Sequence, residues 1–561
     1  LLMRQPYGRE IASTVVYAHP TWYAAQGYIV VIQDVRGRGT SEGKFELFAH
    51  EVDDGYDSVR WAASLPGSSG QVGMYGFSYQ GMTQLYTAQA KPAALKALAP
   101  AMVGYDLYQD WAYENGALRL QVGLGWAIQL AAETARLKAD KTAFNALRTA
   151  SRNLPLNGAV TADPEVLKQY APDSFWHDWI GHTQNDDYWR ALKPNLADVD
   201  LPMLHVGGWF DPYLNGNIRL FKEMAGRSQH PQHLWVGPWS HIPWSRQVGE
   251  TDFGPEAMNP IDRLQVQWFD YFLKGQGSLD PSLVHLFEMG SHRWRHLDAW
   301  PVETEVRQYR LQSSGLAGMR EDDGELVLSP AAATDRCDVL VHDPWRPVPA
   351  LGGHVSWPGG SCDRTALEGR SDILTYTTPL LEHDLAVAGE VGVTLKIQTD
   401  AASYDVCAVL SVVRSNGRDF NLTQGNRRDF EYRYALVTVP LQPTCFRLSA
   451  GQALRLSLSG ACFPAHTVNP GIRTDSLDTV PTIEHQIITL AIYQDGGTLL
   501  TLPLAYSSNS MPLALSLALS AWSSASAWSA RCASWLARCA SWSARSRCSS
   551  GIRSFCSVLR S

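Results

Sequence analysis

The chain lacks a membrane-spanning segment and an excess of positive charge. None of its apolar runs reaches the roughly 20 residues that a helix needs to cross a bilayer, so no membrane partner is expected. The 561 residues include 47 Lys and Arg against 55 Asp and Glu, a formal net charge of −8. Because nucleic-acid-binding surfaces are basic, this balance argues against nucleic acid as the main partner. A chain of this length predicts two to four domains.

Cysteine is scarce and irregularly spaced. Four of the nine Cys lie in the last thirty residues, and the other five are scattered without C-x-x-C spacing. They predict neither a zinc site nor a disulfide framework, and most are expected to be buried as small apolar side chains. The Gly-rich stretch 34–43 is not followed by a Lys-Ser/Thr pair, so it does not predict a phosphate cradle. We instead expect an internally paired loop with Asp34 or Glu42 beside Arg36, and no metal or cofactor.

The two ends of the chain are unusual in composition. Residues 507–561 contain no Asp, Glu, Lys or His but six Arg, in Ser/Ala/Trp/Arg/Cys-rich repeats. This bias is typical of a low-complexity or out-of-frame extension, so we expect this tail to be disordered or aberrant and exclude it from the fold. The chain starts at Leu1 without Met and enters directly into a predicted strand. We therefore expect the first strands of the first domain to be missing.

The stretch 72–81, Val-Gly-Met-Tyr-Gly-Phe-Ser-Tyr-Gln-Gly, organises the first domain. An apolar strand-like run ends at Gly76, Ser78 follows, and a helical pattern begins near Gly81. This order is the strand–turn–helix context of a nucleophile elbow, in which small residues let a Ser hydroxyl project from a tight turn. The second Gly comes one position later than in G-x-S-x-G. Taken alone, the pattern also fits an ordinary tight turn.

Strands and helices alternate around this stretch. Residues 28–33 form a continuous apolar run, residues 51–64 predict a helix with acidic residues in its first turn, and residues 95–100 predict a further strand. This alternation predicts an open parallel α/β sheet in residues 1–103. Residues 104–199 show helical spacing without convincing strands. They predict a helical insertion above the carboxyl ends of the strands, where ligands bind.

The α/β pattern resumes in residues 200–303. Strands are expected over 201–208 and 233–237, and helices over 215–224 and 262–274. Asp211 and His241 each follow the end of a predicted strand. Since the carboxyl ends of parallel strands share one edge of a sheet, Ser78, Asp211 and His241 are expected to converge. Their chain order is the one that α/β-hydrolases use for nucleophile, acid and base. Considered alone, an Asp at the end of a strand is more often a helix cap than a catalytic residue. A His in a loop is likewise more often a solvent-exposed side chain without a catalytic role.

Short alternating segments dominate from residue 304 to 506. They lie at 306–311, 389–398, 406–414, 433–439, 453–459 and 486–492, separated by Gly, Pro and Asn. This spacing predicts an all-β domain of two packed sheets. No chemistry is expected in it.

Several motifs together resemble one family of α/β-hydrolases, which includes bacterial cocaine esterase, X-prolyl dipeptidyl peptidases, glutaryl acylases and α-amino-acid ester hydrolases. The matching segments are 4–7 (RQPY), 34–39 (DVRGRG), 76–81 (GFSYQG), 208–211 (GWFD), 237–241 (GPWSH), 268–275 (WFDYFLKG), 429–434 (DFEYRY) and 463–470 (FPAHTVNP). The form G-x-S-Y-x-G is this family's own. The resemblance implies an α/β-hydrolase fold with an inserted helical cap and a C-terminal all-β jelly-roll sandwich.

The expected chemistry is acyl transfer to water. Ser78 is the predicted nucleophile, His241 the base and Asp211 the acid that orients the imidazole. The backbone N–H of Tyr79 is expected to bind the oxyanion, because it follows the nucleophile. The resemblance implies a second donor, the hydroxyl of Tyr7.

The substrate is expected to be a small-molecule ester or amide. Trp111 and Tyr213 are candidates for the wall of the acyl pocket, although aromatic residues at helical spacing are more often core. An X-prolyl dipeptidyl peptidase is the alternative enzyme, and would need a cap anion for the peptide amino terminus, with Asp106, Asp110 and Glu114 as candidates. A non-catalytic binding protein with a decayed hydrolase fold is a further alternative. The compartment and the oligomeric state stay open, a homo-oligomer included.

Overall fold

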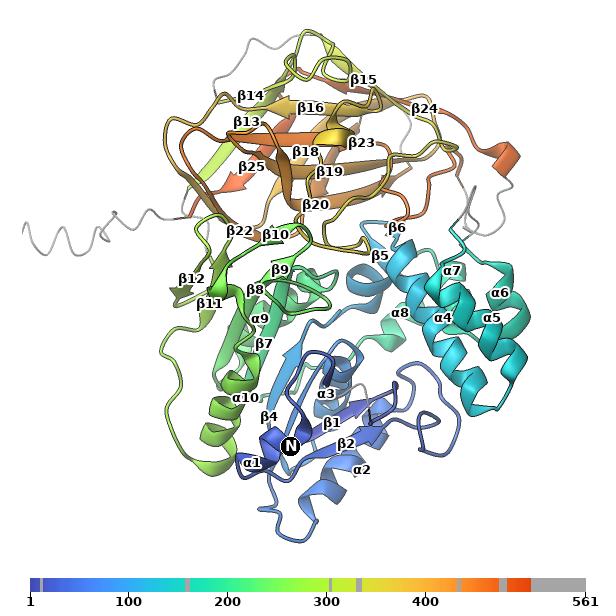
Figure 1. Ribbon diagram of the computed structural model, residues 1–561, viewed down its shortest axis with the longest axis vertical. Coiled ribbons are helices and arrows are strands. Elements are labelled where there is room, and N and C mark those ends of the chain that lie inside the picture. The colour runs from blue at the N-terminus through green and yellow to red at the C-terminus, as the bar shows by residue number, and fades with distance from the viewer. Residues whose placement is uncertain are drawn as a thin grey trace, which may run out of the picture. The chain divides into compact units, whose positions relative to one another are not determined.

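The computed structural model describes residues 1–10, 14–156, 162–301, 305–328, 335–430, 435–473 and 482–505. Residues Leu1–Ala505 form one compact unit (Figure 1). The predicted low-complexity tail and residues 431–434 of the DFEYRY segment lie outside the described residues. Within the described part, no helix is both long enough and apolar enough to span a membrane.

An eight-stranded sheet forms the first layer of the fold, in the spatial order β12-β11-β8-β7-β4-β3-β1-β2. Neighbouring strands from β11 to β2 run parallel, and β12 pairs antiparallel with β11 at one edge. The strands are β1 (Leu2–Gln5), β2 (Val31–Asp34), β3 (Val72–Phe77), β4 (Leu95–Ala101), β7 (Met203–Phe210), β8 (Gln232–Ser240), β11 (Val284–Glu288) and β12 (Arg293–Leu297). The parallel α/β prediction is confirmed, whereas β11 and β12 were not predicted.

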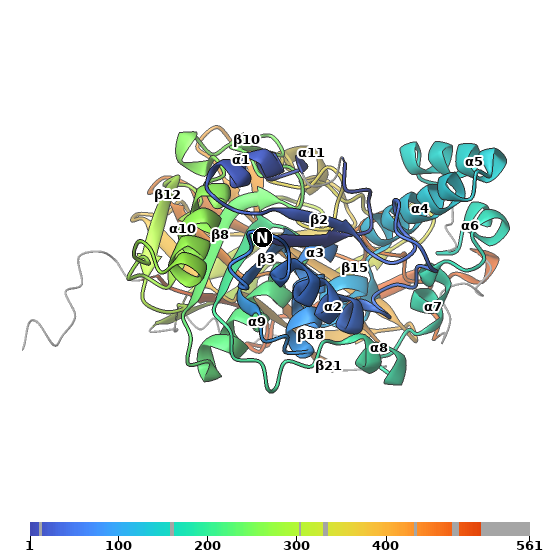
Figure 2. The ribbon, with the colours of Figure 1, turned by 90° about the horizontal axis from the view of Figure 1, so that it is seen from below.

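Helices cover both faces of this sheet (Figure 2). One face packs against α1 (Pro20–Ala25) and α10 (Ile261–Phe269), which continues as the π-helical turn η4 (Asp270–Lys274). The other packs against α2 (Glu51–Ala63), α3 (Tyr79–Gln89) and α9 (Leu214–Arg227). Adjacent strand residues alternate between the two cores, as Met74 and Tyr75 do. Because both faces are covered, central strands such as β3 are apolar on both sides, which explains the continuous runs in the sequence.

The Gly-rich loop after β2 differs from the prediction. Arg36 pairs with Asp54 of α2 rather than with Asp34 or Glu42, because α2 lies beside the loop. The Asp34 carboxylate turns toward the loop backbone and accepts from the N–H of Thr40 at 3.4 Å. Gly39 has a φ of +55°, and a Cβ there would lie 2.0 Å from Asp34, so this close approach requires glycine.

The segment between β4 and β7 is mainly helical, as predicted. It contains a π-helical turn η2 (Leu107–Ala112), then α4 (Leu120–Leu137), α5 (Lys141–Arg152), α6 (Glu165–Tyr170), α7 (Phe175–Gly181) and α8 (Asp187–Leu192). The expectation that it lacks strands is wrong in one detail, because β5 (Tyr113–Glu114) and β6 (Ala117–Leu118) form a short hairpin. Strands of two residues each are too short to show an alternation of apolar and polar residues in the sequence.

The last part of unit Leu1–Ala505 consists mainly of strands, with one short helix, α11 (Thr365–Glu368), and one 3-10 turn, η5 (Thr482–Glu484), among its described residues. Eleven strands share one sheet network, and β17 and β22 form a separate pair. The strands are β13 (Val306–Gln312), β14 (Glu325–Val327), β15 (Cys337–His342), β16 (Ile373–Thr377), β17 (Leu385–Gly389), β18 (Gly392–Thr399), β19 (Tyr404–Val413), β20 (Asp419–Asp429), β21 (Ala435–Pro440), β22 (Thr444–Leu448), β23 (Ala453–Ser459), β24 (Ile488–Tyr493) and β25 (Leu499–Pro503). Five of the nine Cys are described; all five are free, and four of them are buried, as expected.

The sandwich packs against the hydrolase sheet through one continuous apolar core. Side chains of β7, β8 and β11, among them Trp209 and Phe287, join the same cluster as the sandwich residues Val439 and Phe446. Polar contacts cross the junction as well, since the Gln442 side chain donates to the Trp209 carbonyl at 2.9 Å. The carboxyl ends of the parallel strands therefore lie near two other parts of the chain, the helical segment between β4 and β7 and the sandwich (Figure 1).

Candidate active site

Ser78 lies at the sharp turn between β3 and α3, with φ +59° and ψ −126°. This backbone is strained for a residue with a side chain. The glycines around it let the turn pass closely: a Cβ on Gly76 would lie 2.5 Å from Gln80, and one on Gly81 would lie 2.4 Å from Val103. The Ser78 N–H donates to the Ala101 carbonyl at 2.9 Å, which fixes the turn at the carboxyl end of the sheet.

Asp211 and His241 follow the neighbouring parallel strands β7 and β8. Their register pairs Phe210 with Ser240, so the next residue of each strand emerges at the same edge of the sheet. His241 Nδ1 lies 2.7 Å from Asp211 Oδ1, and the Asp211 carboxylate is fully buried. A carboxylate accepting from Nδ1–H leaves Nε2 as the proton acceptor. The ring of Phe77, the residue before Ser78, lies 5.4 Å from the His241 ring.

Tyr7 lies beside Ser78. The phenol follows β1 and accepts a hydrogen bond from Trp126 Nε1 at 3.1 Å. Burial raises the pKa of Tyr7 to about 12, against the Trp126 bond, the nearby Arg38 cation and the neighbouring Ser78 hydroxyl. Tyr7 is therefore a neutral hydrogen-bond donor near pH 7.

The side chain of Tyr79 is anchored away from the site. Its hydroxyl donates to Glu51 Oε1 at 2.7 Å, and the other carboxylate oxygen of Glu51 accepts from Arg4 at 2.6 Å. All three side chains are buried. Burial and the neighbouring Glu51 carboxylate hold the pKa of Tyr79 well above its usual range. This network fixes the first residue of α3, whose backbone N–H follows the Ser.

The two candidate pocket residues lie at different depths. The Tyr213 ring lies edge-on to the His241 ring at 4.9 Å, so it borders the site directly. Trp111 packs behind Tyr213 at 4.4 Å and is only 2% exposed, within the core shared with the cap. The structure thus brings Tyr213 to the site and places Trp111 one layer further back.

The three cap carboxylates proposed for a peptide amino terminus are engaged internally. Asp110 is fully buried, pairs with Arg219 at 2.9 Å and accepts from the Asp106 N–H at 2.7 Å; burial raises the pKa of Asp110 to about 6, against the Arg219 charge. Asp106 caps the π-helical turn η2 and is also buried. Glu114 belongs to a buried cluster with His354 and His466.

That cluster joins the cap to the sandwich. His354 and His466 each lie 3.1 Å from Glu114 Oε2, and Arg119 lies 3.5 Å from the same oxygen. Burial raises the pKa of Glu114, but the two His and Arg119 outweigh burial and hold it well below its usual range. Arg119 also donates to the carbonyl of Pro212 at 2.9 Å. The cluster thus reaches the residue next to Asp211.

Sequence reasoning missed these supporting groups. Arg4 lies in one of the recognised motifs, but nothing in the sequence pairs it with Glu51, and Trp126 was counted only as part of a helical pattern. The His residues of the Glu114 cluster lie in the sandwich, where no chemistry was expected. Only contacts across hundreds of residues connect them to the site.

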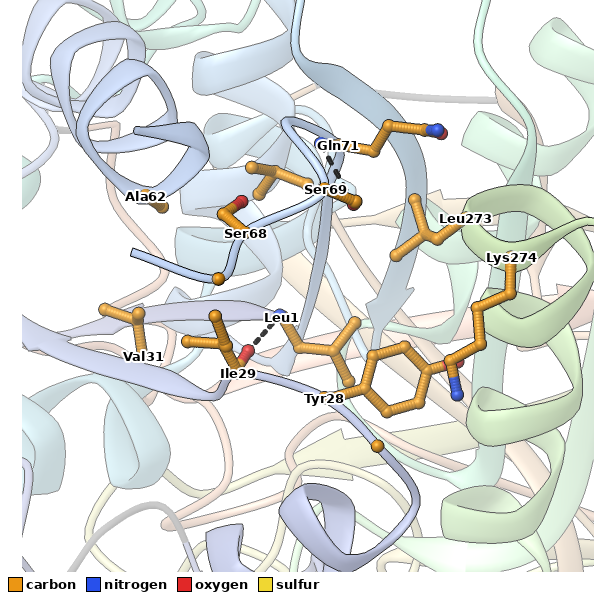
Figure 3. A pocket seen from close by; sticks show the side chains of 13 residues that line it. Leu1, Tyr28, Ile29, Val31, Ala62, Ser68, Ser69, Gln71, Leu273 and Lys274 are labelled. Atoms are coloured by element: carbon orange, nitrogen blue, oxygen red, sulfur yellow. Dashed lines mark hydrogen bonds between the residues drawn. The ribbon is translucent and has the colours of Figure 1, made fainter. Parts of the chain in front are cut away.

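A pocket of about 250 Å³ lies at the opposite end of the sheet (Figure 3). Leu1, Val31 and Val72 line it, and they mark the amino ends of β1, β2 and β3. Ser78, Asp211 and His241 follow the carboxyl ends. This pocket is therefore separate from the candidate active site.

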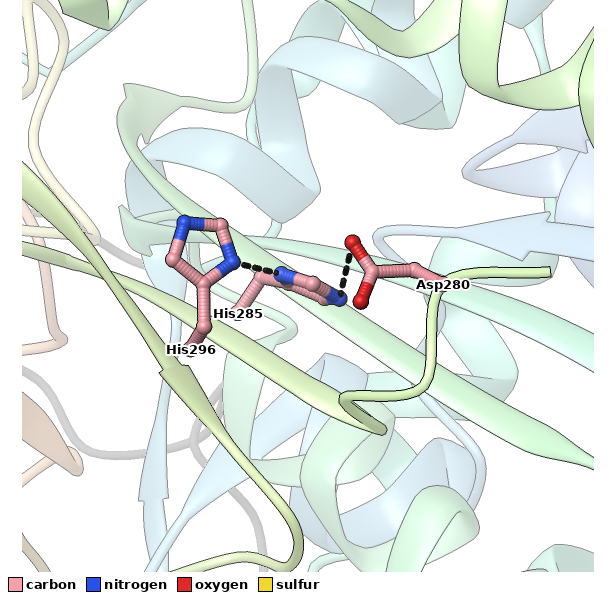
Figure 4. Close-up of side chains that lie close together, drawn as sticks. All are labelled: Asp280, His285 and His296. Atoms are coloured by element: carbon pink, nitrogen blue, oxygen red, sulfur yellow. Dashed lines mark hydrogen bonds and ion pairs between the residues drawn. The ribbon is translucent and has the colours of Figure 1, made fainter. Parts of the chain in front are cut away.

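Asp280, His285 and His296 lie close together beside β11 and β12 (Figure 4). His285 Nδ1 lies 2.7 Å from His296 Nδ1, whereas Asp280 lies 4.0 Å from His285 Nε2. The two neighbours thus contact opposite nitrogens of one imidazole, whose lone pairs diverge. His285 Nε2 also lies 3.1 Å from the Ser282 carbonyl. The two histidines are thus joined by a hydrogen bond, and Asp280 lies at ion-pair distance from the other His285 nitrogen.

A parallel sheet flanked by helices, with Ser at a strained strand–helix turn and an Asp–His pair at later strand ends, defines the α/β-hydrolase class. Comparisons with known proteins agree. Residues 1–243 match the X-Pro dipeptidyl-peptidase (S15 family) model, and residues 277–496 match the X-Pro dipeptidyl-peptidase C-terminal non-catalytic domain. Cocaine esterase of Rhodococcus sp. (strain MB1 Bresler) is 30% identical over 496 residues, covering 83% of this chain and 84% of that protein. The chain belongs to the serine hydrolase family that includes cocaine esterase and the X-Pro dipeptidyl-peptidases (S15 family).

Solved structures share the whole architecture. An aminopeptidase from a marine sediment Thaumarchaeota archaeon superposes with a TM-score of 0.75 at 22% identity, covering 90% of this chain and 91% of that one. An α-amino acid ester hydrolase superposes with a TM-score of 0.71 at 21% identity, with the same coverage. At these identities the likeness concerns the fold alone. The predicted α/β-hydrolase with a C-terminal all-β sandwich is confirmed.

Proposed function

We propose that the chain hydrolyses small carboxylic esters through an acyl-enzyme on Ser78. Ser78 Oγ attacks the ester carbonyl carbon while His241 Nε2 takes the hydroxyl proton, and Asp211 stabilises the resulting imidazolium. The tetrahedral intermediate collapses, and the alcohol leaves with the proton from His241. His241 then takes a proton from water, which attacks the acyl carbonyl carbon; the second tetrahedral intermediate collapses, Ser78 Oγ leaves with the proton from His241, and the acid is released.

The oxyanion of both tetrahedral intermediates requires donors that are already in position. The Tyr79 N–H and the Tyr7 hydroxyl supply them in this proposal, and removing one such donor typically lowers kcat by about 10²–10³-fold. The observation that carries the proposal is the Asp211–His241 pair at 2.7 Å, which follows the strand ends of the same sheet as Ser78 at its strained turn. Nucleophile, acid, base and the Tyr7 donor come from four separate segments, which follow the ends of β3, β7, β8 and β1 in one sheet, and this arrangement supports the proposal.

Ester hydrolysis is favoured over dipeptidyl-peptidase activity. A peptidase that removes dipeptides needs a free carboxylate for the substrate ammonium, and Asp106, Asp110 and Glu114 all have partners within the protein. The cocaine esterase match supports the same choice, because its similarity spans most of both chains. Tyr213 is proposed to border the acyl group, with Trp111 supporting it from behind.

The test is burst release of p-nitrophenol from short-chain p-nitrophenyl esters. The wild-type protein is expected to give a burst close to one equivalent, and Ser78→Ala is expected to give none. Ser64→Ala, which changes an exposed Ser at the end of α2, is the matched control and keeps the burst. A burst that persists in Ser78→Ala would exclude Ser78 as nucleophile. Faster turnover of a Gly-Pro-anilide than of the esters would favour the peptidase instead.

A further inference from the structure

The cap contributes one hydrogen bond to the candidate active site. Trp126, on α4, donates from Nε1 to the Tyr7 hydroxyl oxygen at 3.1 Å. An indole nitrogen is a donor only, so in this contact the Tyr7 oxygen has to accept. The direction of the bond is therefore unambiguous, which is rare for a hydroxyl group.

This direction determines where the Tyr7 hydrogen points. Conjugation keeps a phenol O–H in the plane of its ring, which leaves two positions for the hydrogen, one on each side of the C–O axis. Because the Trp126 N–H donates to the oxygen, the Tyr7 hydrogen points away from Trp126. Ser78 is a further polar neighbour of the phenol, so a hydrogen directed away from Trp126 is available to the reacting atoms.

Trp126 is itself held in one orientation by aromatic packing. Its ring centroid lies 4.9 Å from Phe175, 5.2 Å from Trp111 and 5.9 Å from Trp179. It also contacts the Tyr79 ring at 6.5 Å. Since these neighbours belong to both the cap and helix α3, the indole N–H cannot turn away from Tyr7 without repacking the cluster.

We infer that Trp126 is a positioning residue, which orients the Tyr7 hydroxyl hydrogen toward the oxyanion by donating to its oxygen. The inference rests on the proposed function and deepens it. It gives the cap a role in the chemical step, apart from any role in forming a pocket. An oxyanion donor that is oriented before the reaction costs no reorganisation when charge develops.

The test is a double-mutant cycle on p-nitrophenyl ester hydrolysis with Trp126→Phe and Tyr7→Phe. Trp126→Phe keeps an aromatic ring but removes the donor, and is expected to lower kcat about fivefold, the effect of one ordinary hydrogen bond, with KM changed less than twofold. Tyr7→Phe is expected to lower kcat by about 10²-fold or more. Because Trp126 acts through Tyr7, adding Trp126→Phe to Tyr7→Phe should cause no further loss.

Trp179→Phe is the matched control, because it makes the same change in the same aromatic cluster without a bond to Tyr7. It is expected to keep kcat within twofold of wild type. Equal losses in Trp126→Phe and Trp179→Phe, or losses that multiply in the double variant, would show that Trp126 only supports packing and would overturn the inference. A wild-type kcat in Tyr7→Phe would overturn it too. Failure of the proposed function is distinguishable, since it would appear as a burst retained by Ser78→Ala.

Discussion

Glu51 is predicted to carry much of the stability around the nucleophile turn. Its carboxylate lies between two buried groups, the Arg4 guanidinium at 2.6 Å and the Tyr79 hydroxyl at 2.7 Å. The side chains of Arg4 and Glu51 are 1% and 4% exposed. Glu51→Ala leaves a buried cation with one remaining side-chain partner, the Gln33 oxygen at 2.9 Å, and a buried hydroxyl without an acceptor.

The size of the effect follows from burial. Breaking a buried ion pair by removing one partner typically costs about 3–5 kcal/mol, because the other charge stays buried and unpaired. The orphaned Tyr79 hydroxyl costs about 1–3 kcal/mol, although the two losses share one site and do not add fully. Because the unfolding entropy of the unit Leu1–Ala505 is about 1 kcal/mol/K, each kcal/mol shifts the midpoint by about 1 °C, and Glu51→Ala should lower the midpoint of thermal unfolding by about 3 °C or more.

The assay is thermal unfolding followed by intrinsic tryptophan fluorescence. Its matched comparison is an apolar triple variant, Arg4→Met with Glu51→Leu and Tyr79→Phe, which removes all three polar groups together. Replacing a whole buried ionic network with apolar side chains of similar volume is often neutral, so this variant should unfold near the wild-type temperature. A shift below about 2 °C in Glu51→Ala, or a larger shift in the triple variant, would refute the reasoning.

Two further predictions concern packing and pH. Gly81→Ala should abolish ester hydrolysis and lower the melting temperature, because its Cβ would lie 2.4 Å from Val103; Gly226→Ala in α9, where a Cβ meets nothing within 4 Å, should leave both unchanged or slightly improved. His205 is fully buried, and burial lowers its pKa to about 4. The unfolded chain binds a proton at His205 below about pH 6.5, so this residue should destabilise the fold as pH falls from 6.5 toward 4, by on the order of 3 kcal/mol at most. His205→Gln should remove that part of the pH dependence of the melting temperature.

Each of these predictions has a result that contradicts it. Activity and melting temperature in Gly81→Ala equal to those in Gly226→Ala would mean that the turn tolerates a side chain at its second glycine. For His205, the melting temperatures of wild type and His205→Gln should be measured from pH 4 to pH 7, and the difference between them should shift in favour of the variant as the pH falls. Parallel curves across that range would show that the ring is not held neutral in the folded protein.

The strand ends could be predicted from the sequence because their signals are local. The apolar runs that end at residues 76, 208 and 237 precede Ser78, Asp211 and His241 by two to four positions. The strand β20 (Asp419–Asp429) went unpredicted because it is buried yet rich in Asn, Gln and Arg. β12 (Arg293–Leu297) is an edge strand with a half-exposed, basic sequence, so it has no apolar run to reveal it.

The supporting contacts of the site depend on residues that are distant in sequence. The Glu51–Tyr79 bond spans 28 positions, and the bond between Glu114 and His466 spans 352. A single sequence contains no periodicity that links such pairs. Arg36 illustrates the same limit, since its nearest carboxylates in the sequence are not its partners, and only the position of α2 selects Asp54.

The Glu114 cluster has a consequence for how this chain can be divided or recombined. Glu114 and Arg119 come from the cap, while His354 and His466 come from the sandwich. A chain cut between the two parts would leave a buried carboxylate facing a surface without its histidines, next to the loop that carries Asp211. The sandwich therefore cannot be exchanged as an independent module, and a chimera stays intact only if both histidines are inherited together with the cap hairpin.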